Sequence, residues 1–242
     1  MHRFIVLILA LTVVSAMPDA VAAQSDRGGI RRTTDLPTAE LRQLRRRMNA
    51  GAELSVAGLR ALADAGDSLA AFRFGKRLEE RGDVTLLPDA LHYYAIATFH
   101  GRDFAIPRLI RLLDIYGPDL SKGRLANVLN ALESRARRGN IKAAFALHRL
   151  QTEGKVMPAD PQAARDWLQI AADQGDGDAA LRLGIAWMTP TEGLPADPVR
   201  ARAALELALG DDDLAARVTA ENLLRQLDAG TAPKSTMTEV TQ

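Results

Sequence analysis

The sequence of 242 residues contains no cysteine, only 5% aromatic residues and a formal net charge of +1. The lack of cysteine excludes disulfide scaffolds, thiolate metal sites and cysteine nucleophiles. A charge so close to neutrality excludes a strongly basic protein, so we expect no nucleic-acid partner. The HExxH, GxSxG and P-loop motifs are also missing from the sequence. These absences predict a protein that is not an enzyme and that binds no metal or cofactor.

The sequence is rich in two residue types, with 42 alanines and 34 leucines, and 47% of its residues are hydrophobic. This composition is typical of tightly packed helices. It also excludes a wholly disordered chain, which would have fewer apolar residues and a larger net charge. The length suits one domain or a short array of repeats.

Residues 1–23 have the pattern of a Sec-type signal peptide. Arg3 precedes an apolar run from Phe4 to Val14, and small residues near Ala22 to Gln24 offer a cleavage site. A membrane anchor is the alternative, but the run is shorter than the roughly 20 apolar residues that span a bilayer. We therefore expect a periplasmic or secreted protein without stable membrane insertion after cleavage.

The remaining sequence repeats itself. The segments 90–101 and 164–175 share large residues three and four positions after an alanine, small residues at seven and eight, and glycine at eleven. Glycines that close such segments are 35, 38 and 36 residues apart, a spacing typical of helical-hairpin repeats. These glycines are Gly66, Gly101, Gly139 and Gly175.

The residue types within one repeat explain how neighbouring hairpins pack. Alanines on one helical face let a partner helix approach closely, and a bulky residue fills the groove beside them. Gly75 and Gly184 lack a Cβ where helices cross, whereas Gly101 and Gly175 follow a last helical turn. The residues predicted to pack the repeats together are Gly75, Ala97, Gly101, Trp167, Ala171, Ala172, Gly175 and Gly184.

These motifs resemble the Sel-one-like repeats, which are related to tetratricopeptide repeats and have the pattern A-x-x-x-L-G, a loop, then A-x-x-W-Y-x-x-A-A-x-x-G. The resemblance implies an all-α solenoid of stacked helix-turn-helix repeats that forms a right-handed superhelix. Residues 103–139 are a degenerate copy, because Ile110 replaces the glycine and Ala131-Leu132 replace the aromatic pair. His148 occupies the glycine position of the next copy.

The pattern divides the chain after the signal peptide into three parts. We expect a flexible segment over 24–36, about five hairpin repeats with a capping helix over 37–228, and a disordered tail over 229–242. Asp160 and Asp197 are expected N-caps with proline in the first helical position. Helices are predicted at 38–50, 54–65, 68–80, 88–100, 103–115, 122–138, 141–153, 161–174, 177–188, 197–209 and 212–228.

Several groups of residues have side chains that can form chemical sites, and a structural role is favoured for each. His92 and His100 are about two helical turns apart, too far for one metal ion. The acidic residues at 173–178 lack the spacing of a calcium loop, and those at 211–213 fit a helix N-terminus. The carboxylates of Glu79, Glu80 and Glu133 are expected on a solvated face, and the aromatic residues Trp187, Tyr93 and Tyr94 in the core.

Basic residues are concentrated at 27–47 and 122–149, while acidic residues predominate from Asp173 onward. Such polarity can steer a charged partner, and Arg135, Arg137 and Arg138 form the candidate partner-binding cluster. The stacked hairpins, the export signal and the missing catalytic motifs favour an exported, non-catalytic adaptor or regulator that binds an envelope protein. The resemblance implies a role in envelope signalling or exopolysaccharide control. The alternatives are an enzyme acting on cell-wall or β-lactam substrates and a module that binds anionic polysaccharide. Ordinary solubility is an equally good explanation of the charge pattern, and the oligomeric state stays open.

Overall fold

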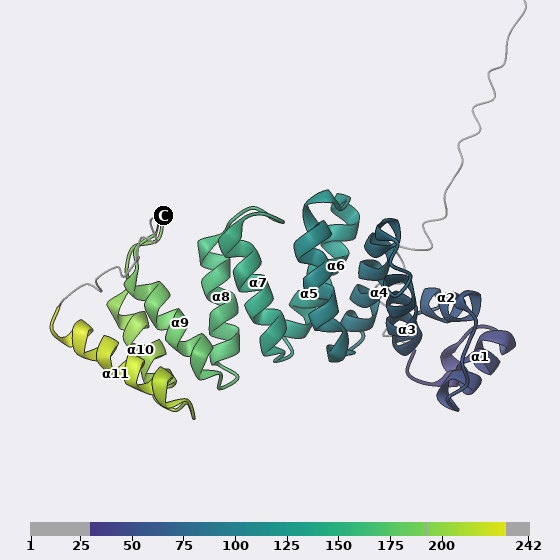
Figure 1. Ribbon diagram of the computed structural model, residues 1–242. Helices are drawn as coiled ribbons and strands as arrows, with labels where there is room; N and C mark the ends of the chain where they lie inside the picture. The colour runs from purple at the N-terminus through teal and green to yellow at the C-terminus, as the bar shows by residue number, and fades with distance from the viewer. Residues whose placement is uncertain (1–29, 192, 231–242) are drawn as a thin grey trace, which may run out of the picture.

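The computed structural model describes residues 30–191 and 193–230 of the chain, and eleven α-helices follow one another along it in a single row (Figure 1). Within these ranges there are no β-strands, only one isolated bridge between Thr191 and Leu194. The all-α fold predicted from the sequence is confirmed. The helices are α1 Ala39–Asn49, α2 Val56–Asp64, α3 Ser68–Glu79, α4 Leu87–Phe99, α5 Ile106–Tyr116, α6 Lys122–Ala136, α7 Ile141–Glu153, α8 Pro161–Ala172, α9 Gly177–Met188, α10 Pro198–Ala208 and α11 Leu214–Asp228.

The helix ends follow from local side-chain chemistry. Asp160 and Asp197 accept a hydrogen bond from the backbone of Ala163 and Arg200, and the residue after each aspartate is proline. These are the N-caps that satisfy otherwise unpaired N–H groups at a helix start. At the closing positions, Gly175 has a φ of +85°, a left-handed conformation that favours glycine over residues with a Cβ. The glycines at 66, 101 and 139 have the same conformation.

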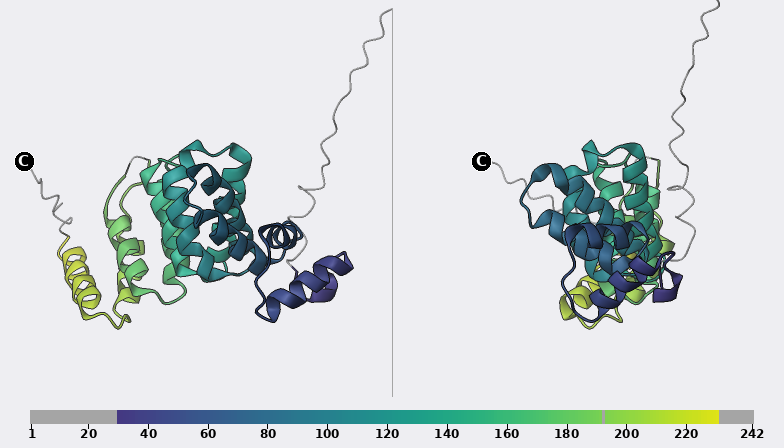
Figure 2. Two further views of the ribbon diagram at one scale, coloured as in Figure 1. Left: turned by 45° about the vertical axis from the view of Figure 1, so that its right-hand side comes forward. Right: turned by 90° about the vertical axis from the view of Figure 1, so that its right-hand side faces the viewer.

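The helices pair into antiparallel hairpins that stack on one another, which makes the fold an α-solenoid. The pairs α3–α4, α7–α8 and α9–α10 pack most closely, and each hairpin packs against the next one. The left view in Figure 2 shows the same succession, with α1 and α11 at opposite ends of the row, and the right view looks along the row from the α1 end. The alanines predicted at the seam are buried: Ala97 and Ala171 are completely inaccessible to solvent.

Two glycines occupy the places where paired helices come closest. A Cβ at Gly75 would lie 3.1 Å from the carbonyl oxygen of Ala90, and one at Gly184 would lie 2.6 Å from the side chain of Leu205. Contacts below 3 Å require a neighbour to move. The short distance between the helices in α3–α4 and α9–α10 therefore depends on the absence of a side chain at these two positions.

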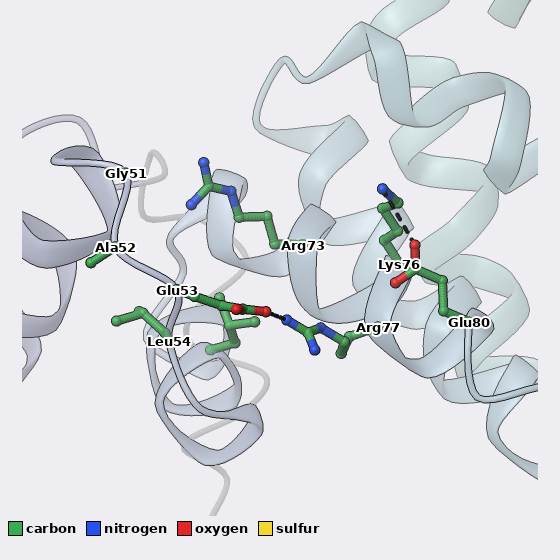
Figure 3. A pocket seen from close by; sticks show the side chains of 9 residues that line it. Gly51, Ala52, Glu53, Leu54, Arg73, Lys76, Arg77 and Glu80 are labelled. Atoms are coloured by element: carbon green, nitrogen blue, oxygen red, sulfur yellow. Dashed lines mark hydrogen bonds and ion pairs between the residues drawn. The ribbon is translucent and has the colours of Figure 1, made fainter.

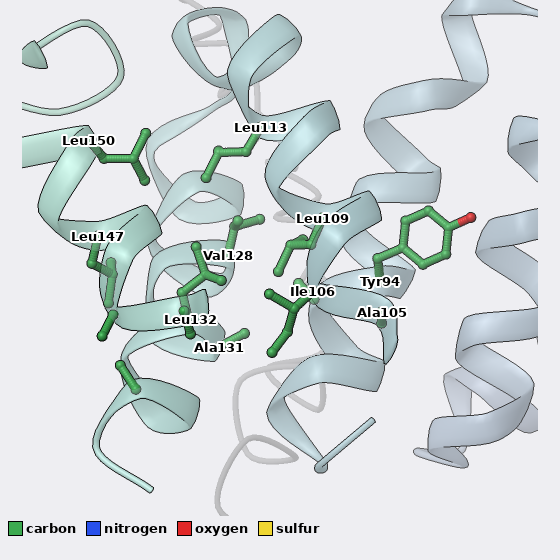
Figure 4. Packing of buried hydrophobic residues seen from close by; sticks show 14 of the residues in the cluster. Tyr94, Ala105, Ile106, Leu109, Leu113, Val128, Ala131, Leu132, Leu147 and Leu150 are labelled. Carbon is green, nitrogen blue, oxygen red and sulfur yellow. The ribbon is translucent and has the colours of Figure 1, made fainter. Parts of the chain in front are cut away.

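The middle hairpin, α5–α6, is built differently. The closest neighbours of α6 are α4 and α7, whereas α5 packs mainly on α4. Leucine, isoleucine and valine side chains fill the space between α5, α6 and α7 (Figure 4). Ile110 stands where α3 and α9 have glycine, and α5 and α6 do not form the close pair seen in the other hairpins. The side chains that Figure 4 labels in this layer include Ile106, Leu109, Leu113, Val128, Leu132, Leu147 and Leu150.

Part of the segment expected to be flexible is packed against the first helices. Leu36 is 1% exposed, and the guanidinium of Arg45 donates hydrogen bonds to the carbonyl oxygens of Ile30 and Arg31. Residues 30–36 thus differ from the prediction, because a side chain from α1 binds the backbone of this segment. The predicted signal peptide, its cleavage site and residues 231–242 lie outside the described residues. Within the described ranges, no helix combines the length and apolarity needed to cross a lipid bilayer.

Candidate partner-binding surface

The three arginines predicted to bind a partner do not form one free cluster. The guanidinium of Arg135 donates a hydrogen bond of 3.0 Å to the carboxylate of Asp103 and lies 2.8 Å from its other oxygen, and the Arg135 side chain is 15% exposed. Arg137 lies over the ring of Trp167, with 5.1 Å between the guanidinium carbon and the ring centre. Arg138 is exposed and forms no ion pair with any described residue. Only the last of the three is therefore free to meet an external anion without breaking an internal contact.

A groove of about 670 Å³ lies on one face of the stack, between α5, α7 and α9. These are the first helices of three successive hairpins. Pro107, Ile110 and Phe145 give the groove an apolar part, and Lys142 and Arg182 bring cations to it. Its volume falls in the range of protein sites that hold a side chain or a small ligand. The repeat pattern gives no sign of this groove other than departures from the repeat such as Ile110.

Most charged side chains around the groove are already paired. Arg149 donates to the carboxylate of Asp114 at 2.6 Å, and this bond raises the pKa of the arginine. The guanidinium of Arg182 lies 2.9 Å from Asp178 and also over the ring of Phe145, at 5.4 Å from its centre. Lys142 is exposed and has no ion-pair partner among the residues that the structure describes. The groove thus has one cation available for an external carboxylate.

His148 also lines the groove, and its hydrogen bond determines which ring nitrogen carries the proton. Its Nδ1 lies 3.0 Å from the carbonyl oxygen of Ala164. Since a carbonyl only accepts hydrogen bonds, Nδ1 is protonated and Nε2 of the neutral ring is left as an acceptor. Burial lowers the pKa of His148 more than its hydrogen bond to Ala164 raises it, and the charge of Arg182 also lowers it. The ring is therefore neutral at pH 7.

A second hollow, of about 480 Å³, lies between the α1–α2 loop and α3 (Figure 3). Arg77 is bonded to Glu53 across it, and Lys76 lies 3.3 Å from Glu80 along α3. The guanidinium of Arg73 donates only a 3.4 Å bond to a backbone carbonyl. This hollow is more polar than the α5–α7–α9 groove, and most of its charges are paired within the chain.

The other candidate residues have structural partners. Asp176 caps α9 through the backbone N–H of Ala179, and Asp213 caps α11. Glu79 is bonded to Tyr94, Arg108 and Arg111, so its carboxylate holds α3, α4 and α5 together. No group of three or more histidine, aspartate or glutamate side chains suited to a metal ion occurs within residues 30–191 and 193–230.

Trp187 and Arg165 form a buried unit near the α9–α10 loop. The guanidinium groups of Arg165 and Arg200 both lie over the ring of Trp187, with their central carbons 4.5 and 4.7 Å from a ring centre. Arg165 is 4% exposed and donates to the carbonyl oxygen of Thr189. Burial lowers the pKa of Arg165. This arrangement fixes the loop on the hairpin and leaves the tryptophan with its predicted place in the core.

Because burial lowers the pKa of His92, His100 and His148 below 6.5, the protein should lose stability in mild acid. For His92, Arg124 lowers the pKa further, while Asp89 and Asp64 oppose the shift. A depressed pKa means that the unfolded chain binds protons more readily. The free energy of unfolding should therefore be highest above about pH 6.5 and fall as the pH drops through that value toward the folded-state pKa values.

Urea denaturation at a series of pH values between neutral and mildly acidic would measure this decline. A chain in which all three histidines are replaced by glutamine should lose less stability over the same pH interval. An equal slope of stability against pH in both chains would contradict the assignment to these histidines.

No protein-family model matches the chain, and no curated protein does. A solved structure of a protective antigen present in uropathogenic Escherichia coli strains, described as displaying an SLR fold, is 22% identical, with a TM-score of 0.32. The match covers 80% of this chain and 54% of that one. A Sel1 repeat protein from Oxalobacter formigenes is 26% identical with a TM-score of 0.41, over 86% of this chain and 58% of that one. The present chain thus spans little more than half the length of either protein. It is similar to Sel1 repeat proteins of known structure, the family that its repeat motif resembles.

Proposed function

We propose that this protein is an exported, non-catalytic adaptor that binds a protein partner on the surface of its solenoid. The observation that carries the proposal is the groove across α5, α7 and α9, where an apolar surface lies on stacked hairpins beside Lys142, which has no ion-pair partner among the described residues. Stacked repeats create extended binding surfaces of this kind. The signal-peptide pattern of residues 1–23 supports export.

The two ends of the solenoid carry opposite charge, which would orient an approaching partner. Residues 30–49 include six arginines and two acidic residues, whereas residues 211–228 include five acidic residues and two arginines. Charges distributed in this way raise the rate of association with a complementary protein, and the effect weakens as salt is added. The resemblance to Sel-one-like repeats suggests a role in envelope signalling or exopolysaccharide control, and we include that role in the proposal.

The internal pairing of the arginines gives no support to polysaccharide binding. Arg45 and Arg135, which belong to the basic segments 27–47 and 122–149, and Arg108 between them are bonded to carboxylates of the protein itself. A polyanion that used these three arginines would have to displace their carboxylates, at the cost of internal ion pairs. A protein partner that uses the apolar part of the groove does not meet this difficulty.

The proposal is tested by binding the purified protein to extract from the cell envelope and identifying what it retains. We expect the solenoid to retain a protein partner. Its binding should be saturable, and added free solenoid should compete for it. A variant with Arg137→Glu and Arg138→Glu reverses the charge of two arginines in the cluster predicted from the sequence. Weaker binding of the partner by this variant would show that the cluster contributes to the interface. An unrelated protein on the same resin is the control.

Failure to enrich any protein above that control would contradict the adaptor proposal. Hydrolysis of nitrocefin by the purified chain with catalytic turnover would replace the proposal with the enzyme alternative. Each measurement requires only the folded protein and no knowledge of the partner.

A further inference from the structure

The α5–α7–α9 groove lies where two consecutive hairpins depart from the repeat pattern. Ile110 and His148 occupy the positions that hold Gly75 and Gly184 in the flanking hairpins. Both replacements line the groove. In a repeat protein, equivalent positions of successive hairpins make the same packing contacts. Two side chains in place of glycine at one groove therefore indicate a role other than packing the helices together.

The contacts at the flanking glycines show what the replacements change. A Cβ at Gly75 would lie 3.1 Å from the carbonyl oxygen of Ala90, and a Cβ at Gly184 would lie 3.4 Å from the carbonyl oxygen of Ala201. In α7–α8 the ring of His148 reaches the corresponding carbonyl, that of Ala164, and bonds it at 3.0 Å. The side chain thus takes over the contact that close backbone approach makes elsewhere.

The chemistry of the groove selects the class of ligand. Ile110 and Phe145 present apolar surface, whose removal from water favours binding of an apolar group. Arg149 and Arg182 have carboxylate partners within the protein, at 2.6 and 2.9 Å. Lys142 is the cation without such a partner in the described part of the chain, so the groove favours an apolar group that carries a carboxylate beside it.

We propose that this groove binds a segment of the partner protein in which an aliphatic or aromatic residue is next to an acidic one. The apolar side chain packs against Ile110 and Phe145, and the carboxylate pairs with Lys142. The neutral ring of His148 offers its Nε2 as an acceptor for an N–H group. This inference rests on the proposed adaptor function and names the surface and the ligand chemistry by which it acts.

The test uses a short fluorescein-labelled peptide in which leucine alternates with aspartate, and fluorescence anisotropy measures its binding to the purified solenoid. We expect saturable binding that is lost when lysine replaces the aspartates or serine replaces the leucines. Lys142→Glu should weaken binding at least about tenfold, because a like charge replaces the attractive one. Ile110→Thr should weaken it through the apolar part of the groove.

Lys122→Glu is the matched control, since Lys122 is an equally exposed lysine at the start of α6 and outside the groove. It makes the same change in net charge, and we expect unchanged binding. Thermal denaturation of each variant checks that the fold is kept. Equal binding by Lys142→Glu and the parent, or equal loss in Lys122→Glu and Lys142→Glu, would overturn the assignment of the groove.

The same variants separate this inference from the proposed function. If the parent protein enriches an envelope partner and Lys142→Glu and Ile110→Thr enrich it equally, the groove is wrong and the adaptor proposal stands. If the parent binds neither the peptide nor any envelope protein, the proposed function fails. Peptide binding that depends on both Lys142 and Ile110 supports the groove.

Discussion

Replacing Ala171 with arginine is expected to destabilise the protein by several kcal/mol. Ala171 lies in α8 and is completely inaccessible to solvent, at the seam where hairpins stack. An arginine there must either bury an unpaired charge or push the helices apart, and an uncompensated buried charge costs about 3–5 kcal/mol. Urea denaturation followed by circular dichroism would give the change in the free energy of unfolding.

Gln169→Arg is the matched control for this substitution. Gln169 lies in the same helix but is exposed, so the same charge meets water instead of the seam. Surface substitutions of this kind usually change stability by less than about 0.5 kcal/mol. If Ala171→Arg unfolds at the same urea concentration as the parent protein, the inward face of α8 has been misassigned.

Replacing Asp67 with asparagine should also cost about 3–5 kcal/mol, the range for breaking a buried ion pair. The carboxylate of Asp67 lies 2.8 Å from the guanidinium of Arg45, and the side chains are only 3% and 10% exposed. Its other oxygen accepts from the backbone N–H of Ala70 and caps α3. Asparagine keeps an oxygen for the cap, so the loss comes mainly from the unpaired charge of Arg45.

Two further variants check this reasoning in the same denaturation experiment. Adding Arg45→Met to Asp67→Asn removes the stranded charge and should restore part of the lost stability. Asp89→Asn breaks an ion pair with Arg124 whose side chains are 48% and 45% exposed, and such surface pairs contribute at most about 1 kcal/mol. An equal loss in Asp67→Asn and Asp89→Asn would show that burial of the Arg45–Asp67 pair does not strengthen it.

Local chemistry explains why the helices could be predicted. Asp160 and Pro161 begin α8, and Gly175 closes the turn after it, because capping and left-handed backbone depend on residues a few positions apart. The repeat spacing adds the pairing of helices, since hairpins joined by short turns pack on each other. Both kinds of information lie within one repeat and need no distant contact.

The contacts of the candidate residues could not be predicted in the same way. Arg135 is bonded to Asp103, 32 positions away, and Tyr93 donates to Asp64, 29 positions away. Their partners lie in other helices. Counting basic residues in the sequence therefore overestimates how many are available to bind a partner. Some of them form ion pairs with neighbouring helices once the hairpins stack.

The sequence by itself determined the helices, their caps and their order in the stack, since each depends on residue types at short, regular spacing. Only the tertiary structure decided that Arg135 is paired, that residues 30–36 are held by Arg45, and that Ile110 and His148 share one groove. The reason is physical. A groove or an ion pair between hairpins depends on which side chains from distant positions meet once the helices have packed.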